Sequence, residues 1–548
     1  MMICRWRVHL LSTLLVLLMS GGSLPAAQPR SYGGVTPRMT DETRTPDPLP
    51  SVPVEQASSQ IPWKPGHPEW ERMLNYYVTN NILPGVAVLI DSPNWGGRFM
   101  AAGKPNLEDP SVKFHPSTQF RIGSCSKIFI AVLILQLDAE HKLNLEDRIA
   151  KYLPASVIRK IHNGDILTIL QCLDMTAGLY SYTNEEYLGE VTEENAMYDF
   201  TQEEILTITK NEGTLTTEYP GGTPDGEIPF YTYSNTGYLV CGLIAEALLK
   251  KPLEQLLKER IFDAIGITDT FFATDYRVTT RTARGYVGFS EFGFWIDCTR
   301  YNQDVPWAAG AVVSTPFDMI RFYRTLLKTE DLLPKASIAK LLQMNYCGEH
   351  QGYGKGILEE LLPTGASYGH GGTALGYLTA VFYYPERDFL YLQFCNTFNN
   401  KYTRAEICYR VMDYLLGACE EPVPAPGAQD VPLKDGSLRL AWHAGDYYGD
   451  EHHVYIGTDE QAVDQATPEK HDGLQYARVK DFFFEAKNLR SQTTYYWRVD
   501  AVHTKTDREL DAEQALINNN LGNETSYAER SPEPQRYLPG PTWSFRVQ

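Results

Sequence analysis

The sequence has little positive charge relative to negative charge. Its 49 Lys and Arg residues stand against 68 Asp and Glu residues, which gives a formal net charge of −19. Nucleic-acid binding needs a basic face, and we find no Lys/Arg cluster that would supply one. The composition therefore argues against a nucleic-acid partner.

The sequence also lacks metal-ligand spacings. None of its nine cysteines follows a C-x-x-C pattern, and we predict neither a metal site nor any cofactor. The eight cysteines after the N-terminal segment lie in apolar contexts, so buried free thiols are the preferred interpretation. Disulfides remain an alternative, because an exported protein can form them.

Apolar runs long enough to span a membrane are absent. Arg5 and Arg7 precede the apolar stretch from Leu10 to Met19, and small residues follow at 21–27. About 10 apolar residues are too few to cross a bilayer, which needs about 20. The pattern predicts a signal peptide at residues 1–27, with an uncleaved anchor as the alternative. We expect an exported protein, periplasmic or extracellular, without a membrane span after signal removal.

Changes in composition divide the rest of the chain. Residues 28–61 are rich in Pro, Ser, Thr and Gly, which predicts a disordered spacer. Residues 62–420 have a globular pattern, and the Pro-rich stretch 421–434 predicts a linker. In residues 435–548 short strand candidates alternate with turns, as in a small all-β sandwich.

The order of elements within residues 62–420 indicates the fold class. One strand pair is expected at 86–90 and 98–102, and a second at 375–384 and 389–395, with helical patterns between them. An antiparallel sheet with helices packed on it accommodates this order. We therefore predict an α+β fold, followed by the all-β sandwich.

Ser124-Cys125-Ser126-Lys127 is an S-x-x-K motif at the start of a predicted helix over 124–140. The spacing places Ser124 and Lys127 on one helical face, about 5–6 Å apart at Cβ. A serine hydroxyl is a weak nucleophile until a base takes its proton, and a desolvated lysine can be that base. Alone the motif is weak, because Ser337 to Lys340 repeats it, and an ordinary capping serine is the alternative.

Two further segments can complete a hydrolytic site. In Tyr233-Ser234-Asn235, the phenol can relay protons and the amide can bind a substrate carbonyl and orient the lysine. We prefer this triplet over Tyr182-Thr183-Asn184, because an apolar helix follows it. Core and turn roles are the alternative for Tyr233 and Asn235.

His370-Gly371-Gly372-Thr373 opens a late strand. Glycines let a substrate backbone approach the strand edge, so we expect Gly371, Gly372 and Thr373 to bind substrate. The Thr373 N–H can pair with that of Ser124 as an oxyanion hole. His370 can hydrogen-bond the substrate or the tyrosine, and a purely structural histidine is the alternative.

Taken in order, these segments resemble the serine β-lactamase-related family of class C β-lactamases, D-alanyl-D-alanine carboxypeptidases, D-aminopeptidases and esterases. The resemblance covers about residues 62–416 and is carried by Phe120 to Lys127, Met175 to Leu179, Tyr233 to Tyr238, Ala309 to Thr315 and Gly369 to Thr373. It implies an acyl-enzyme on Ser124, with Lys127 and Tyr233 handling protons. Penicillin-binding members carry Lys-Thr-Gly where this chain has His370-Gly371-Gly372. A histidine is mostly neutral near pH 7, which favours carboxypeptidase or esterase activity over efficient β-lactam hydrolysis.

The C-terminal region resembles a fibronectin type III-like module, on the residues 440–442, 454–458, 494–500 and 543–545. Its tryptophans Trp442, Trp497 and Trp543 fit a sandwich core, with an aromatic platform for glycan as the alternative.

Two hypotheses for function follow. The first is a secreted serine hydrolase with a small-molecule or peptide substrate, a D-amino-acid peptide, ester or β-lactam, with a cell-wall peptide as one candidate. The second is a catalytically weak scaffold that binds peptidoglycan or peptides. The complete set of Ser124, Lys127, Tyr233 and Asn235 favours the enzyme. The sequence does not indicate an oligomeric state.

Overall fold

The computed structural model describes part of the chain from residue 64 onward. The segments outside the description are 1–63, 67, 94–95, 184–200, 212–230, 274–278, 280, 290–293, 300–304, 349–350, 363–364, 398–406, 409–410, 412–419, 444–450, 481–482, 504–535 and 539–541. The predicted signal peptide and spacer thus lie outside the described residues. The chain forms two compact units. Among the described residues, the first holds Lys64 and those from Leu74 to Thr397, and the second holds Pro65–Met73 and those from Ile407 onward.

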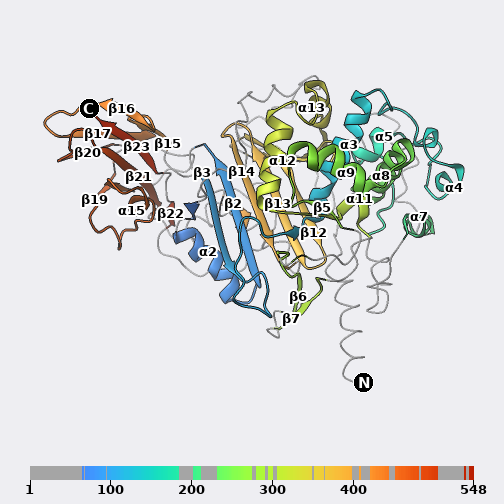
Figure 1. The fold of residues 1–548 in the computed structure, drawn as a ribbon, viewed down its shortest axis with the longest axis horizontal. Coiled ribbons are helices and arrows are strands. Elements are labelled where there is room, and N and C mark those ends of the chain that lie inside the picture. The colour runs from blue at the N-terminus through green and yellow to red at the C-terminus, as the bar shows by residue number, and fades with distance from the viewer. Residues whose placement is uncertain are drawn as a thin grey trace, which may run out of the picture. The chain divides into compact units, whose positions relative to one another are not determined.

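A nine-stranded sheet forms the centre of the first unit (Figure 1). Both predicted strand pairs are present, and they lie next to each other because Phe389–Cys395 pairs antiparallel with Gly85–Ser92. The strands in spatial order are β1 (Lys64–Pro65), β3 (Gly96–Gly103), β2 (Gly85–Ser92), β14 (Phe389–Cys395), β13 (Tyr377–Tyr384), β12 (Gly365–Ala374), β11 (Leu358–Leu362), β10 (Gln351–Tyr353) and β9 (Asn345–Gly348).

Every residue of β2, β13 and β14 is buried. Such continuous burial requires cover on both faces of the sheet, and it explains why these strands are mostly apolar instead of alternating between apolar and polar residues. The helices α3, α8, α9 and α12 gather beside the sheet in Figure 1. Their bounds are α3 (Lys127–Ala139), α8 (Asn235–Leu249), α9 (Leu253–Leu257) and α12 (Pro316–Lys328). Other helices include α2 (Pro68–Thr79), α5 (Ile169–Leu173), α11 (Trp307–Gly310) and α13 (Lys335–Leu341).

Helix α3 is the central helix of this unit. Eleven of its thirteen residues are buried, from Lys127 to Asp138. A helix that is apolar on all sides belongs in a core, and here it packs with the aliphatic residues of α8, α12 and the sheet. The predicted helix at 124–140 therefore exists, but its first turn is a separate 3₁₀ turn, η1 (Gly123–Ser126).

The second unit consists mainly of β-strands in two sheets, with one short helix, α15 (Glu460–Asp464), among its described residues. One has the order β15–β17–β20, and the other contains β16, β23, β21, β18 and β19, with β22 beside β21. The bounds are β15 (Glu420–Val423), β16 (Ala428–Val431), β17 (Leu438–His443), β18 (Glu451–Gly457), β19 (Gln475–Val479), β20 (Phe483–Ala486), β21 (Thr494–His503), β22 (Arg536–Leu538) and β23 (Trp543–Val547). The predicted all-β character is confirmed, whereas the likeness to fibronectin type III stays a prediction.

Two expectations for this unit are corrected. Residues 421–434, predicted as a linker, contribute β15 and β16, because their backbone groups pair with β17 and β23. The alternative of an aromatic platform is wrong for Trp442, Trp497 and Trp543. These rings are at most 4% exposed and pack together in the core between the sheets.

Six cysteines have described side chains, and none of these six forms a disulfide. Cys125, Cys172, Cys241, Cys298 and Cys395 are buried, which agrees with the preferred interpretation for these five, and Cys408 is partly buried. Within the described ranges, no helix has the length and apolarity to cross a membrane.

Candidate active site

Ser124 lies on the turn η1, between the short strand β4 (Phe120–Arg121) and helix α3. Its side chain is partly exposed, while its neighbours Gly123, Cys125 and Ser126 are buried. Gly123 has a φ of +51°, and a Cβ there would lie 2.7 Å from the Thr373 nitrogen. Glycine is needed at this position both for its backbone conformation and for the close approach of strand β12.

The other residues of the S-x-x-K motif have separate roles. Ser126 accepts a hydrogen bond from the Val312 N–H at 3.0 Å, and the Cys125 thiol donates to the His370 carbonyl oxygen at 3.1 Å. Both side chains hold neighbouring strands against η1. As expected, neither competes with Ser124 as a nucleophile.

Lys127 is completely buried. Its Nζ lies 2.8 Å from Ser124 Oγ and 2.9 Å from the carbonyl oxygen of Ala309, which are its hydrogen-bond partners among the described residues. Both partners are neutral. Burial disfavours the charged amine and holds the pKa of Lys127 well below its usual value. A neutral amine carries the lone pair that a general base needs.

Tyr233 completes a triangle around the serine. Its hydroxyl donates to Ser124 Oγ at 2.8 Å, and its ring centroid lies 5.0 Å from Lys127 Nζ. The segment that carries Tyr233 is anchored next to it, because the Thr232 N–H donates to the Met175 carbonyl oxygen at 2.8 Å. Helix α8 then begins at Asn235, capped by the Ser234 hydroxyl. The resemblance had singled out both of these segments.

Asn235 is near this triangle but is held differently from the expectation. Its Nδ2 donates to Thr183 Oγ1 at 2.6 Å, and its backbone N–H donates to Ser181 Oγ at 3.2 Å. Among the described residues the hydrogen bonds of Lys127 go to Ser124 and Ala309, and none joins it directly to Asn235. The role of Asn235 in orienting the lysine stays a prediction. The Thr183 hydroxyl, from the triplet that we set aside, takes the amide instead.

Strand β12 brings the glycine segment against the serine turn. Residues 365–369 of this strand pair with β11, while residues 370–374 extend beyond that pairing. A Cβ on Gly372 would overlap the Ile122 carbonyl oxygen and lie 3.2 Å from Cys125 Sγ. The segment Gly371-Gly372-Thr373 therefore runs beside η1, and Thr373 is exposed at its end.

His370 lies inside β12 instead of opening it, and it is only 3% exposed. Its Nδ1 contacts the carbonyl oxygen of Gly371, and its Nε2 lies 3.3 Å from the Tyr353 hydroxyl. Its ring centroid lies 6.2 Å from that of Tyr233. Both ring nitrogens of His370 therefore face protein groups, whereas we expected this side chain to hydrogen-bond the substrate or Tyr233.

Three residues that contact the site residues, Ala309, Thr183 and Tyr353, were not predicted from the sequence as part of the site. Ala309 lies in a segment of the resemblance, but its carbonyl was not singled out. Thr183 lies in the second Tyr-x-Asn triplet, which was a usable signal. Tyr353 carried no signal, since the chain has 34 tyrosines.

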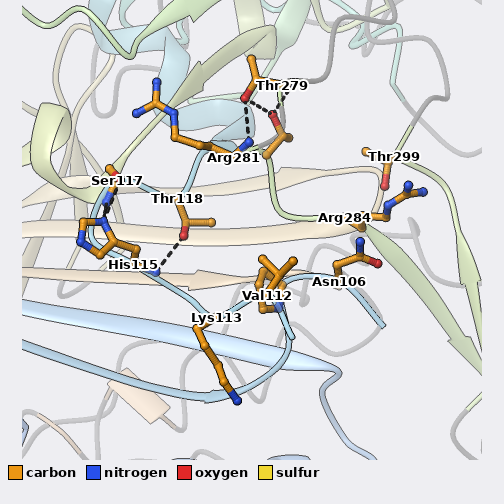
Figure 2. A pocket seen from close by; sticks show the side chains of 12 residues that line it. Asn106, Val112, Lys113, His115, Ser117, Thr118, Thr279, Arg281, Arg284 and Thr299 are labelled. Carbon is orange, nitrogen blue, oxygen red and sulfur yellow. Dashed lines mark hydrogen bonds between the residues drawn. The ribbon is translucent and has the colours of Figure 1, made fainter. Parts of the chain in front are cut away.

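A separate hollow of about 240 Å³ lies elsewhere in the first unit (Figure 2). Its lining is polar and basic and includes none of the residues discussed above. Arg281 and Arg284 are paired with Asp269 and Asp297, so these two charges are compensated. His115 turns toward Ser117 Oγ at 2.7 Å.

The geometry agrees with comparisons to known proteins. The chain is 24% identical over 263 residues to Penicillin-binding protein 4 of Amycolatopsis lactamdurans, which covers 47% of this chain and 63% of that protein. It spans about half the length of other curated relatives that it matches.

Solved structures share the fold of the first unit. A D-stereospecific amidohydrolase from Streptomyces sp. superposes with a TM-score of 0.53 at 24% identity, covering 61% of this chain and 95% of that one. A D-amino acid amidase from Ochrobactrum anthropi SV3 superposes with a TM-score of 0.53 at 22% identity, covering 63% and 96%.

The family profile described as Beta-lactamase matches residues 75–410, which is more than half of the chain. This range contains the serine turn, the buried lysine, the tyrosine and the glycine segment of β12. The chain therefore belongs to the Beta-lactamase family.

Proposed function

We propose that this protein is a serine hydrolase that works through an acyl-enzyme on Ser124. One observation carries the proposal: the amine of Lys127 and the phenol of Tyr233 each lie 2.8 Å from Ser124 Oγ. A nucleophile with two proton-handling groups within hydrogen-bond reach is the geometry that acyl transfer requires.

In the first step, the neutral Lys127 amine uses one hydrogen to bind the Ala309 carbonyl oxygen, and its lone pair accepts the Ser124 proton. Ser124 Oγ then forms a bond to the substrate carbonyl carbon, and the carbonyl electrons move onto its oxygen. The N–H groups of Ser124 and Thr373 would stabilise this oxyanion.

In the second step, the oxyanion collapses and the bond to the leaving group breaks. The leaving amine or alcohol takes a proton from the Lys127–Tyr233 pair, whose two polar atoms are equally far from Ser124 Oγ. Water, deprotonated by the same pair, then attacks the acyl carbon and releases Ser124. Each proton taken from a nucleophile is returned to a leaving group, so the cycle is balanced.

For the substrate, we propose a small amide, peptide or ester related to D-amino acids. The support is indirect. In the sequence His370 stands where penicillin-binding members carry a lysine that would attract a substrate carboxylate. The names of two structural relatives concern a D-amino acid amidase and a D-stereospecific amidohydrolase. Efficient β-lactam hydrolysis is the less favoured activity. Export, to the periplasm or the outside of the cell, is a further proposal that rests on the pattern of residues 1–27.

Covalent labelling with a fluorophosphonate or a fluorescent penicillin tests the proposal. We expect labelling of the wild-type protein and none of Ser124→Ala. Ser337→Ala is the matched control, because it removes the serine of the other S-x-x-K sequence, on helix α13. A folded wild-type protein that is never labelled would instead favour a binding scaffold.

Kinetics on D-amino acid amides, p-nitrophenyl esters, D-alanyl peptides and nitrocefin would then rank the substrates. We expect amides and esters to be turned over faster than nitrocefin. Equal or faster turnover of nitrocefin would overturn the substrate proposal without affecting the role of Ser124.

A further inference from the structure

Tyr353 is a fully buried residue at the end of strand β10. The register of the sheet aligns it with Leu358 on β11 and, through Leu358, with Gly369 on β12. Its side chain can therefore reach His370, the next residue of β12. The Tyr353 ring contacts the rings of Tyr231, Tyr233 and His370, with centroids 5.8, 6.1 and 5.8 Å away.

The hydrogen bonds of His370 define the tautomer of its ring. Nδ1 faces the carbonyl oxygen of Gly371, which can only accept, so Nδ1 carries a proton. In the neutral ring Nε2 is then an acceptor, to which the Tyr353 hydroxyl, 3.3 Å away, can donate. The same hydroxyl also hydrogen-bonds that of Tyr238, whose own proton goes to the Leu173 carbonyl oxygen at 2.6 Å. Burial holds the pKa of the Tyr353 phenol well above its usual value, so this hydroxyl keeps the proton that it donates.

This arrangement connects Tyr353 to the reacting groups along two routes. Through His370 it fixes the Gly371 carbonyl, and with it the strand segment whose next residues lie against η1. Through its ring it supports Tyr233, whose hydroxyl contacts Ser124. The turn after Tyr353 also lies against the catalytic helix, because a Cβ on Gly356 would be 2.7 Å from the Lys127 carbonyl oxygen.

We propose that Tyr353 is a positioning residue of the active site: its hydroxyl holds His370 in the Nδ1–H form, so that His370 fixes the glycine segment of β12 beside Ser124. The inference rests on the proposed function for its effect on catalysis. It gives His370 a structural task within the site, in place of direct contact with substrate.

Tyr353→Phe isolates the hydroxyl, because it keeps the ring and its packing. We expect kcat for an ester substrate to fall about tenfold, as for loss of one buried hydrogen bond that aligns reacting groups, while KM changes less than about twofold. Tyr377→Phe is the matched control, since it removes a buried hydroxyl that donates to the Ala283 carbonyl oxygen at 2.8 Å. Its kcat should stay within about twofold of the wild-type value. An unchanged kcat in Tyr353→Phe would overturn the proposal.

A double-mutant cycle tests the route through His370. In a His370→Asn background, Tyr353→Phe should change kcat by less than about twofold, because the group it acts on is gone. A full tenfold loss in that background would show that Tyr353 does not act through His370.

The tautomer can be measured without any catalytic activity. In protein with ¹⁵N-labelled histidine, the His370 signals, assigned by their loss in His370→Asn, should report a protonated Nδ1 and an unprotonated Nε2. A proton on Nε2 in the wild-type protein would overturn the inference. If instead serine reagents fail to label the wild type while this tautomer is found, the proposed function fails and the Tyr353–His370 pair stands.

Discussion

The hydroxyl of Tyr233 donates a hydrogen bond to Ser124 Oγ at 2.8 Å, although 109 positions separate the two residues. The contact exists because the start of helix α8 and the turn before helix α3 meet at one place. As a result, the Tyr233 hydroxyl and the buried Lys127 amine both contact Ser124 Oγ.

Tyr233→Phe should therefore impair catalysis without unfolding the protein. We expect kcat/KM to fall at least ~100-fold, the low end for a general acid–base group. Tyr182→Phe serves as the control, because the hydroxyl of Tyr182 donates to the Pro306 carbonyl oxygen and not to Ser124. If the Tyr233→Phe enzyme kept more than a third of its activity, the phenol would have no part in proton transfer.

Lys127 should govern the pH dependence of the rate. Because its pKa lies below the ordinary value of 10.5, the amine already loses its proton at a lower pH than an exposed lysine does. We therefore expect kcat/KM to rise with pH as the free enzyme loses that proton. Lys127→Ala should lower the acylation rate at least ~100-fold and remove this rise. A wild-type profile that is flat on the acid side would argue against a lysine base.

Lys127 should also cost stability. Between its folded pKa and the ordinary value of 10.5, the amine is neutral in the folded chain and protonated in the unfolded chain. The unfolded state therefore binds more protons, and wild-type stability rises with pH through this window. Lys127→Met removes the effect, so its melting temperature relative to the wild type should increase as pH falls from 10.5. Calorimetry across that range checks this, and a difference independent of pH would contradict it.

Gly372→Ala should separate β12 from the serine turn. A Cβ there would overlap the Ile122 carbonyl oxygen, which belongs to backbone and cannot rotate away. We expect covalent labelling of Ser124 to fall more than tenfold, since an ångström-scale displacement can cost about 100-fold. Gly473→Ala is the control, because no atom lies within 4 Å of a Cβ added at Gly473. Labelling of Ser124 in this variant should equal that in the wild type.

Trp442→Ala should destabilise the second unit and leave the chemistry of the first intact. The ring is 1% exposed and packs on Trp497 and His452, so its removal should cost about 3–5 kcal/mol. Chemical denaturation followed by tryptophan fluorescence measures the loss. Labelling of Ser124 under native conditions should persist, and its disappearance would show that the two units depend on each other.

Much of the site could be predicted from sequence, because its parts are local. The spacing of Ser124 and Lys127 is a property of one helical turn, and the apolar strands and the helix at 127–139 follow from composition and periodicity. The linker at 421–434 was predicted wrongly, because Pro-rich composition does not reveal that backbone groups find partners in distant strands.

The sequence by itself determined the pairing of Ser124 with Lys127, the α+β order of elements and the all-β second region, because each depends on neighbouring residues. Only the tertiary structure decided that Asn235 binds Thr183, that Lys127 donates to the Ala309 carbonyl oxygen, and that Tyr353 lies against His370. These contacts join segments far apart in the chain. Their formation depends on how the sheet, helices and turns pack in three dimensions, which no local pattern encodes.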